Sequence, residues 1–270
     1  MSKIYTKKDI REQLEKMGAP RDSVVLIHSS LRAVGEVEGG AEGLLDALVE
    51  YFTRDGGLFC VPTHTWAMLD EEITLDMSSD KTCLGAFSTV ALRDGRGIRS
   101  LNPTHSMVVF GEREKAEKFI ADEPFIKSAT SPESCYGKLC ALNGKVLLVG
   151  VGHNRNTYIH SAEEMLNIPN RMEEKPNRTV TKMPSGELIE RDILEFKTDY
   201  IDDVSLRFVK YETPFRYHRC IVDGFIGNAP TQLCDARKMK ETIELIYKNS
   251  EGIDVLSDEK PIPQKYYAHK

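Results

Sequence analysis

The chain has 270 residues, of which 40% are hydrophobic and 29% are charged, a composition typical of globular proteins. Its formal net charge of −6 argues against general nucleic-acid binding, because phosphate contacts need a basic face. The longest apolar run, residues 146–151, has the length of a buried strand, whereas a membrane-spanning helix needs about 20 apolar residues. We therefore expect a cytoplasmic protein, and the charged amino-terminal residues do not resemble a secretory signal.

Strands and helices alternate along the first 150 residues. Apolar runs without alternation predict strands that are buried on both faces, at 24–27, 58–62, 107–110 and 146–149. Apolar residues at helical spacing predict helices at 7–17, 44–52, 113–121 and 134–142. This alternation is typical of α/β folds.

The pattern changes after Pro169. Residues 178–183 and 187–196 flank Pro184-Ser185-Gly186, which predicts a hairpin, and residues 201–210 and 235–249 have helical spacing. We predict a single α/β domain over residues 1–270, with a central mixed β-sheet flanked by helices and an added antiparallel hairpin in the C-terminal half.

Three histidines lie near the ends of predicted strands, in loops rich in Ser and Thr: His28, His64 and His105. Ligands of α/β sheets bind at strand ends, although such residues also serve simply to satisfy loop backbone. No H-x-x-x-H or H-E-x-x-H pair is present, so we expect no metal site and rank a metal-dependent hydrolase second.

A second candidate lies on a helix that begins at Asn156 or Thr157 and runs through Met165. His160 and Glu163 are three residues apart on this helix and share a face. A carboxylate there can hold one imidazole nitrogen and leave the other free to accept a proton. The alternative is an ordinary surface pair that contributes a few tenths of a kcal/mol.

Five patches, in order, resemble the aminoglycoside 3-N-acetyltransferases, the antibiotic N-acetyltransferase family. They lie between about Val24 and Pro169 and are Leu26–Leu31, Gly56–Thr65, Arg99–Ser106, Ser131–Gly137 and Gly150–Glu163. The third patch departs from the family, which has His before the proline where this chain has Asn102.

The resemblance implies transfer of acetyl from acetyl-coenzyme A to the 3-amino group of an aminoglycoside, by direct attack in a ternary complex. It implies His160 as the general base, oriented by Glu163, with Thr157 or Ser106 among the possible donors to the oxyanion. It also implies a coenzyme site formed by Ser29, Ser30, Leu31, Thr65, Arg99, His105 and Ser106.

An aminoglycoside is a polycation, so its groove should be acidic. Two acidic clusters are available, and we favour Asp70, Glu71 and Glu72, which follow the loop at His64, over the cluster at 199–203. A non-catalytic protein that binds a cationic ligand remains a further alternative.

Overall fold

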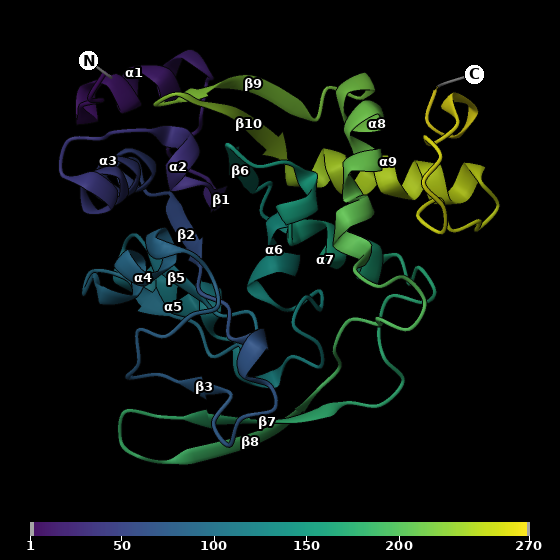
Figure 1. The fold of residues 1–270 in the computed structure, drawn as a ribbon, viewed down its shortest axis with the longest axis horizontal. Coiled ribbons are helices and arrows are strands. Elements are labelled where there is room, and N and C mark those ends of the chain that lie inside the picture. The colour runs from purple at the N-terminus through teal and green to yellow at the C-terminus, as the bar shows by residue number, and fades with distance from the viewer. Residues whose placement is uncertain (1–2, 269–270) are drawn as a thin grey trace.

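The computed structural model describes residues 3–268, which form a seven-stranded sheet with helices on both faces and a separate three-stranded sheet (Figure 1). The large sheet has the order β4-β5-β2-β1-β6-β10-β9. Its strands are β1 (Val24–Ser29), β2 (Leu58–Pro62), β4 (Ile98–Arg99), β5 (Met107–Phe110), β6 (Lys145–Val149), β9 (Ile221–Ile226) and β10 (Ala229–Asp235). Since β2, β1 and β6 are parallel and the other pairs antiparallel, the predicted mixed sheet is confirmed.

Alternate residues of the central strands face two different hydrophobic clusters. Val25 and Ile27 of β1 belong to one cluster, and Val24 and Leu26 to the other. The first cluster includes residues of α1 (Lys7–Lys16), α3 (Gly40–Thr53) and α4 (Ala86–Arg93). The second includes residues of α5 (Arg113–Ile120), α6 (Cys135–Ala141), α7 (Tyr158–Met165) and α9 (Ala236–Asn249). Helices therefore cover both faces, which explains the continuous apolar runs.

The small sheet contains the predicted hairpin. Strands β7 (Asn177–Lys182) and β8 (Leu188–Ile193) pair antiparallel, and β3 (Leu75–Asp76) adds to β7 in parallel. This sheet lies at the lower edge of the view in Figure 1, away from α1 and α3. Residues 194–205 lead from it back towards the main body, so the hairpin delivers side chains to the centre of the molecule.

Several elements differ from the sequence expectations. The helix expected at 201–210 is a 3₁₀ helix, η4 (Val204–Tyr211), which begins three residues later and is followed by α8 (Glu212–Tyr217). The tail contains η5 (Gln264–Tyr266). The hairpin β9–β10 was not predicted. Its turn at Gly227 has a φ of +60° and lies against the Val34 carbonyl, a contact between distant segments. The remaining short helices are α2 (Leu31–Val34), η1 (Trp66–Met68), η2 (Glu123–Phe125) and η3 (His153–Arg155).

Within residues 3–268, none of the helices has the length and apolar character that crossing a membrane requires.

Candidate active site

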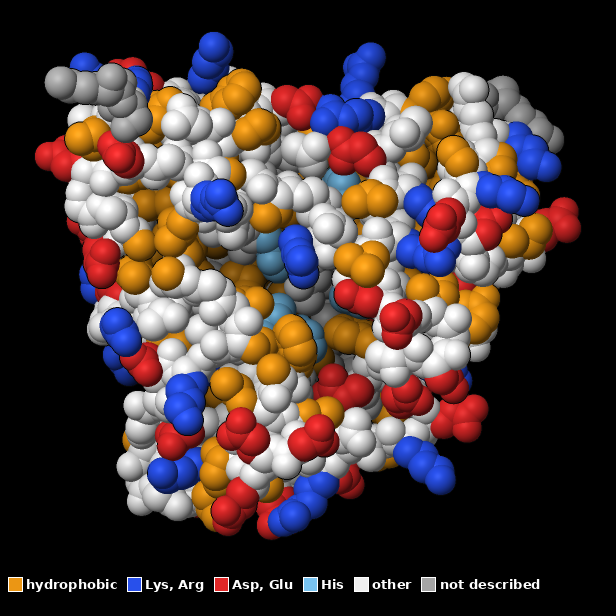
Figure 2. Space-filling view, viewed as in Figure 1, with side chains coloured by type: hydrophobic (Ala, Val, Ile, Leu, Met, Phe, Trp, Pro, Cys, Tyr) orange, Lys and Arg blue, Asp and Glu red, His pale blue; other side chains and the backbone are white. Residues whose placement is uncertain are grey.

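A cleft of about 1010 Å³ opens where the parallel strands β1, β2 and β6 end. In Figure 2 it is a hollow in the middle of the molecule with histidine side chains on its floor. Its walls come from the loops after β1 and β6, the start of α4, and the segment after β8. The site thus occupies the strand-end position that α/β sheets offer to ligands.

The three strand-end histidines converge in this cleft, as their positions predicted. The rings of His64 and His105 have centroids 4.4 Å apart, and His64 shares a hydrogen bond of 2.7 Å with the Tyr136 hydroxyl. Burial lowers the pKa of His28 and of His105 to about 3 and lowers that of His64 well below its usual value. These rings are therefore neutral at pH 7.

Asn102, where the chain departs from the family pattern, positions the His105 loop. Its side-chain oxygen accepts a hydrogen bond of 2.9 Å from the backbone N–H of His105, and its amide donates to the Ala129 carbonyl at 2.9 Å. The side chain is fully buried. Asn102 therefore does not line the cleft itself but fixes the backbone of His105, which does.

Helix α7 carries His160 and, at its N-cap, Thr157, and both side chains line the cleft. Tyr158 and Ser161 hold the helix by donating to the carbonyls of Ala236 and Thr130. The Thr157 hydroxyl makes no hydrogen bond within residues 3–268, so it is free to donate to a ligand. Burial, His105 and Arg171 lower the pKa of His160 to about 3.

Glu163 does not contact His160 as the spacing suggested. Its two oxygens accept hydrogen bonds from Arg171, at 2.6 Å to Nε, and from the Tyr211 hydroxyl, at 2.8 Å. Arg171 bridges on to Asp254. Glu163 is fully buried, and a buried carboxylate is stabilised by a cation, which Arg171 supplies and a neutral imidazole does not. The expected orienting contact is therefore corrected: Glu163 anchors α7 to the segment that follows it.

The coenzyme residues expected from the resemblance divide into two groups. Ser29, Ser30, Leu31 and His105 line the cleft. Thr65 and Ser106 lie behind its floor, where Thr65 donates to the Pro103 carbonyl at 2.7 Å and Ser106 donates to the Thr63 carbonyl at 2.8 Å. Their hydroxyls tie loops together, and this corrects the expectation that they line the site.

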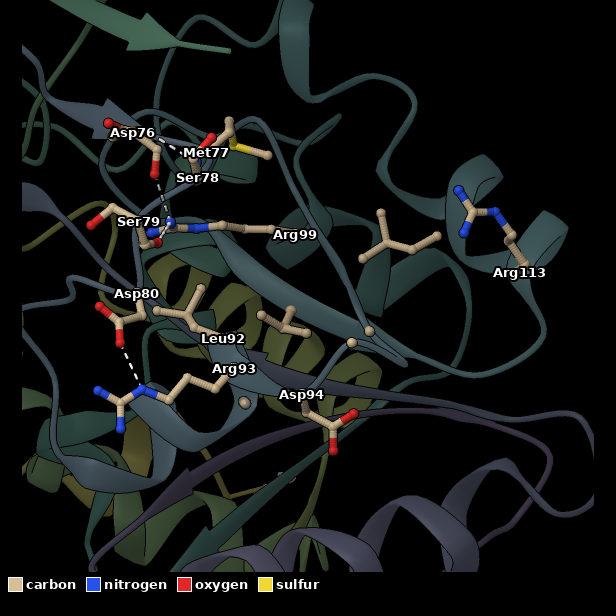
Figure 3. Close-up of a pocket in the computed structure, with 15 residues that line it drawn as sticks. Asp76, Met77, Ser78, Ser79, Asp80, Leu92, Arg93, Asp94, Arg99 and Arg113 are labelled. Carbon is tan, nitrogen blue, oxygen red and sulfur yellow. Dashed lines mark hydrogen bonds and ion pairs between the residues drawn. The ribbon is translucent and has the colours of Figure 1, made fainter. Parts of the chain in front are cut away.

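Arg99 faces a different cavity, of about 860 Å³, shown in Figure 3. Its guanidinium donates to the carbonyls of Asp76 and Ser79, at 3.1 and 3.0 Å, and burial lowers its pKa to about 10. Arg155, in contrast, lines the cleft and makes no side-chain hydrogen bond or ion pair within the described part of the chain. Arg155 is therefore a cleft-lining cation that is free to meet a phosphate.

The favoured acidic cluster also lies elsewhere. Asp70, Glu71 and Glu72 are exposed and are not among the residues that line the cleft. The lining carboxylates are instead Glu173, Glu195, Asp202 and Asp203. Acidic side chains gather along the lower side of the hollow in Figure 2. Two residues of the second cluster, Asp202 and Asp203, therefore line the cleft, and the favoured cluster does not.

Glu195 is a candidate that the sequence interpretation missed. It follows β8 in the chain and lines the cleft, and its Oε1 is shielded from solvent without a hydrogen-bond partner among residues 3–268. Burial raises its pKa to about 7, although a hydrogen bond from Thr104 opposes the rise. The expected strand at 187–196 contained Glu195, but no local pattern distinguishes it from the other charged residues of that strand.

Across residues 3–268, no group of three or more His, Cys, Asp or Glu side chains is placed to hold a metal ion.

Comparison with known proteins identifies a family. The family model for aminoglycoside 3-N-acetyltransferases matches residues 26–247. Aminoglycoside N(3)-acetyltransferase IV from Salmonella is 30% identical over 239 residues, which are 88% of this chain and 85% of the relative. The aminoglycoside N(3')-acetyltransferase-like protein YokD of Bacillus subtilis is 27% identical over 225 residues, 75% of this chain and 80% of the relative.

Solved structures show the same fold. The apoenzyme of aminoglycoside acetyltransferase AAC(3)-IVa superposes with a TM-score of 0.75 at 30% identity, covering 90% of this chain and 88% of that one. AAC-IIIb in a binary complex with coenzyme A shares the fold with a TM-score of 0.77 at 23% identity, covering 91% and 97%. From the family match and the Salmonella relative, the chain belongs to the aminoglycoside 3-N-acetyltransferase family.

Proposed function

We propose that this enzyme transfers acetyl from acetyl-coenzyme A to the 3-amino group of an aminoglycoside, with His160 as the general base. The observation that carries the proposal is one cleft lined by the imidazole of His160, the uncommitted hydroxyl of Thr157 and several carboxylates. Supporting it, a histidine-to-alanine mutant of AAC(3)-IVa, 29% identical to this chain, was solved with gentamicin, and AAC-IIIb with coenzyme A.

The chemistry needs no covalent acyl-enzyme. An alkyl ammonium cannot attack a thioester, so His160 accepts a proton from the substrate nitrogen, whose electron pair then attacks the thioester carbonyl carbon. Thr157 donates a hydrogen bond to the resulting oxyanion, since the Ser106 hydroxyl is already engaged with Thr63. The carbon–sulfur bond then breaks, the coenzyme thiolate takes the proton from the imidazolium, and the nitrogen of the new amide releases its second proton to solvent.

The charge on the imidazolium requires a nearby carboxylate, because burial alone disfavours it. Glu163 is committed to Arg171, so we assign this electrostatic role to Glu195, which lines the same cleft. The same burial raises the pKa of Glu195 to about 7 and lowers that of His160. Pairs of titratable groups whose pKa values are shifted in opposite directions are typical of the acids and bases of active sites.

The two substrates need walls of opposite charge. Glu173, Asp202 and Asp203 suit a polycation, whereas the loop Ser29–Leu31 and Arg155 suit the phosphates and pantetheine of the coenzyme. We expect the reaction to take place in the cytoplasm, which stays a prediction.

The test is to incubate the purified protein with acetyl-coenzyme A and a panel of aminoglycosides while following thiol release. The acetylated nitrogen of the product is then located by NMR. We expect thiol release only with an acceptor, at an unchanged rate in the presence of a chelator. Binding of aminoglycoside without thiol release would indicate the non-catalytic alternative, and inhibition by the chelator would indicate the metal-dependent hydrolase.

A further inference from the structure

Among residues 3–268, no polar side chain or backbone group holds the ring of the proposed base. Neither nitrogen of His160 has a hydrogen-bond partner within the described residues, and the carboxylate three residues away is bound to Arg171 and Tyr211. General-base catalysis nevertheless needs the ring nitrogen at a fixed position relative to the amine. The ring must therefore be oriented by something other than a hydrogen bond.

Two phenylalanines enclose the His160 ring. Phe196 is stacked on it, with centroids 3.9 Å apart and an interplanar angle of 18°, and Phe208 meets it edge-on at 4.7 Å and 69°. Phe208 is fully buried in η4. Phe196 comes from the segment after β8, directly beside Glu195, and lines the cleft. Contacts from two separate elements thus restrict how the imidazole can rotate.

We propose that Phe196 is a positioning residue for acetyl transfer, holding the His160 ring by face-to-face stacking and stabilising the imidazolium with its π-face. The proposal rests on His160 being the base. The face of a benzene ring carries partial negative charge and attracts a cation above it. Because this attraction grows only when His160 takes up the substrate proton, it acts mainly in the transition state.

Two other ionisable groups near His160, namely His105 and Arg171, disfavour the charged ring. The His105 ring contacts Phe196 edge-on, with ring centroids 5.4 Å apart. Both His105 and Arg171 lower the pKa of His160. Arg171 is itself paired with Glu163 and Asp254. Glu195, the carboxylate assigned above to stabilise the imidazolium, precedes Phe196 in the chain and Lys197 follows it. Both line the cleft, and Lys197 pairs with Asp199. Phe196 is thus the group in direct contact that favours the charged ring.

The test compares Phe196→Leu, which keeps an apolar side chain, with Phe196→Tyr, which keeps the aromatic face. We expect kcat of Phe196→Leu to fall by about 3- to 30-fold, the equivalent of one cation–π contact, and Phe196→Tyr to retain most of the activity. The acid limb of the kcat/KM profile should move to lower pH in Phe196→Leu, because the imidazolium loses a stabilising contact. Phe125→Leu is the control, since Phe125 is 82% exposed and does not line the cleft.

The pKa of His160, measured by NMR titration of its ring in each variant, separates this proposal from the proposed function. A lower pKa in Phe196→Leu than in wild type and Phe196→Tyr supports the contact even if His160→Ala shows that His160 is not the base. Equal His160 pKa values in all three proteins, or equal losses of kcat in the Leu and Tyr variants, would overturn it. If Phe196→Leu does not fold, the Tyr variant and a Phe196→Trp variant decide, because both must keep wild-type pH profiles.

Discussion

The proposed site places a half-buried, neutral imidazole where the substrate amine would react. His160 has its pKa lowered to about 3 by burial, so the ring is free of its proton at pH 7 and able to accept one. The same burial makes the imidazolium costly, and nearby groups have to compensate for this. The activity of the site therefore depends on residues that are far apart in the sequence.

His160→Ala removes the proposed base, so turnover at pH 7 should fall by about 10²- to 10⁴-fold, the usual contribution of a positioned general base. The residual rate should rise with pH beyond the range where wild type levels off, since the amine then loses its proton to solvent. Steady-state kinetics between pH 6 and 10 measure both effects, and coenzyme binding should survive. Near-wild-type turnover would make His160 structural and redirect attention to His105 or His28.

Glu195→Gln keeps the shape of the side chain and removes its titration. The pKa of Glu195 is about 7, so its carboxylate forms as the pH rises through 7, and wild-type kcat should rise over that range. The variant should lack this rise and be slower at pH 8.

The same substitution should also change stability. Because the pKa of Glu195 is higher in the folded state, its carboxyl opposes folding increasingly as the pH rises from the ordinary pKa of a glutamate to 7. Glu195→Gln should then melt at a higher temperature than wild type at pH 8 and at the same temperature at pH 4.

The exposed Glu190, on the preceding strand, provides the matched control for this substitution. Glu190→Gln should leave the pH–rate profile and the melting temperature at pH 8 unchanged. A pH–rate profile of Glu195→Gln that coincides with wild type would remove Glu195 from the mechanism.

At the scale of the elements, one arginine connects the small sheet to the body. Arg191 of β8 donates to the carbonyls of Glu123 and Leu101 and to the Thr181 hydroxyl. Leu101 immediately precedes Asn102, which holds His105. The strand that ends shortly before Glu195 and Phe196 is thus tied to the loop of another cleft residue.

Arg191→Ala should lower the melting temperature and kcat together, because it leaves carbonyls without donors, at a cost of about 1–3 kcal/mol. Arg178→Ala is the control on the neighbouring strand: Arg178 pairs with Glu190 in an exposed ion pair, which contributes little to stability because solvent screens it. Thermal melts and steady-state kinetics of both variants give the comparison. Equal effects of the two substitutions would show that Arg191 has no special role in docking the hairpin.

Helices and strands with a clear hydrophobic pattern in the sequence were predictable, whereas those that depend on contacts with distant segments were not. The strand at 107–110 and the hairpin around 184–186 follow from apolar runs and turn residues. The short β4 and the pair β9–β10 carry weaker patterns and owe their place to neighbouring strands. The same limit applies to the site: spacing put His160 and Glu163 on one helix face, but only the fold reveals that Arg171 takes the carboxylate.

For the whole molecule, we expect residues 1–270 to behave as one domain. The two hydrophobic clusters share the same central strands, since neighbouring residues such as Val25 and Leu26 face opposite clusters. Loss of either cluster exposes one face of the sheet and destabilises the other. Urea unfolding should therefore show a single transition that coincides for circular dichroism and for the fluorescence of the one tryptophan, Trp66. Two separated transitions would instead indicate independent domains.

The charge of the cleft should govern recognition of the amine substrate. If Glu173, Asp202 and Asp203 attract a polycation, its apparent KM should rise several-fold as salt increases from about 0.05 to 0.5 M, because the screening length shortens, while the KM for acetyl-coenzyme A changes less. Asp202→Asn should raise the amine KM at low salt and flatten its salt dependence. Asp70→Asn, in the exposed cluster outside the cleft, should leave both unchanged. If Asp70→Asn had the larger effect, the aminoglycoside would bind along the loop after β2 and not against the segment at 199–203.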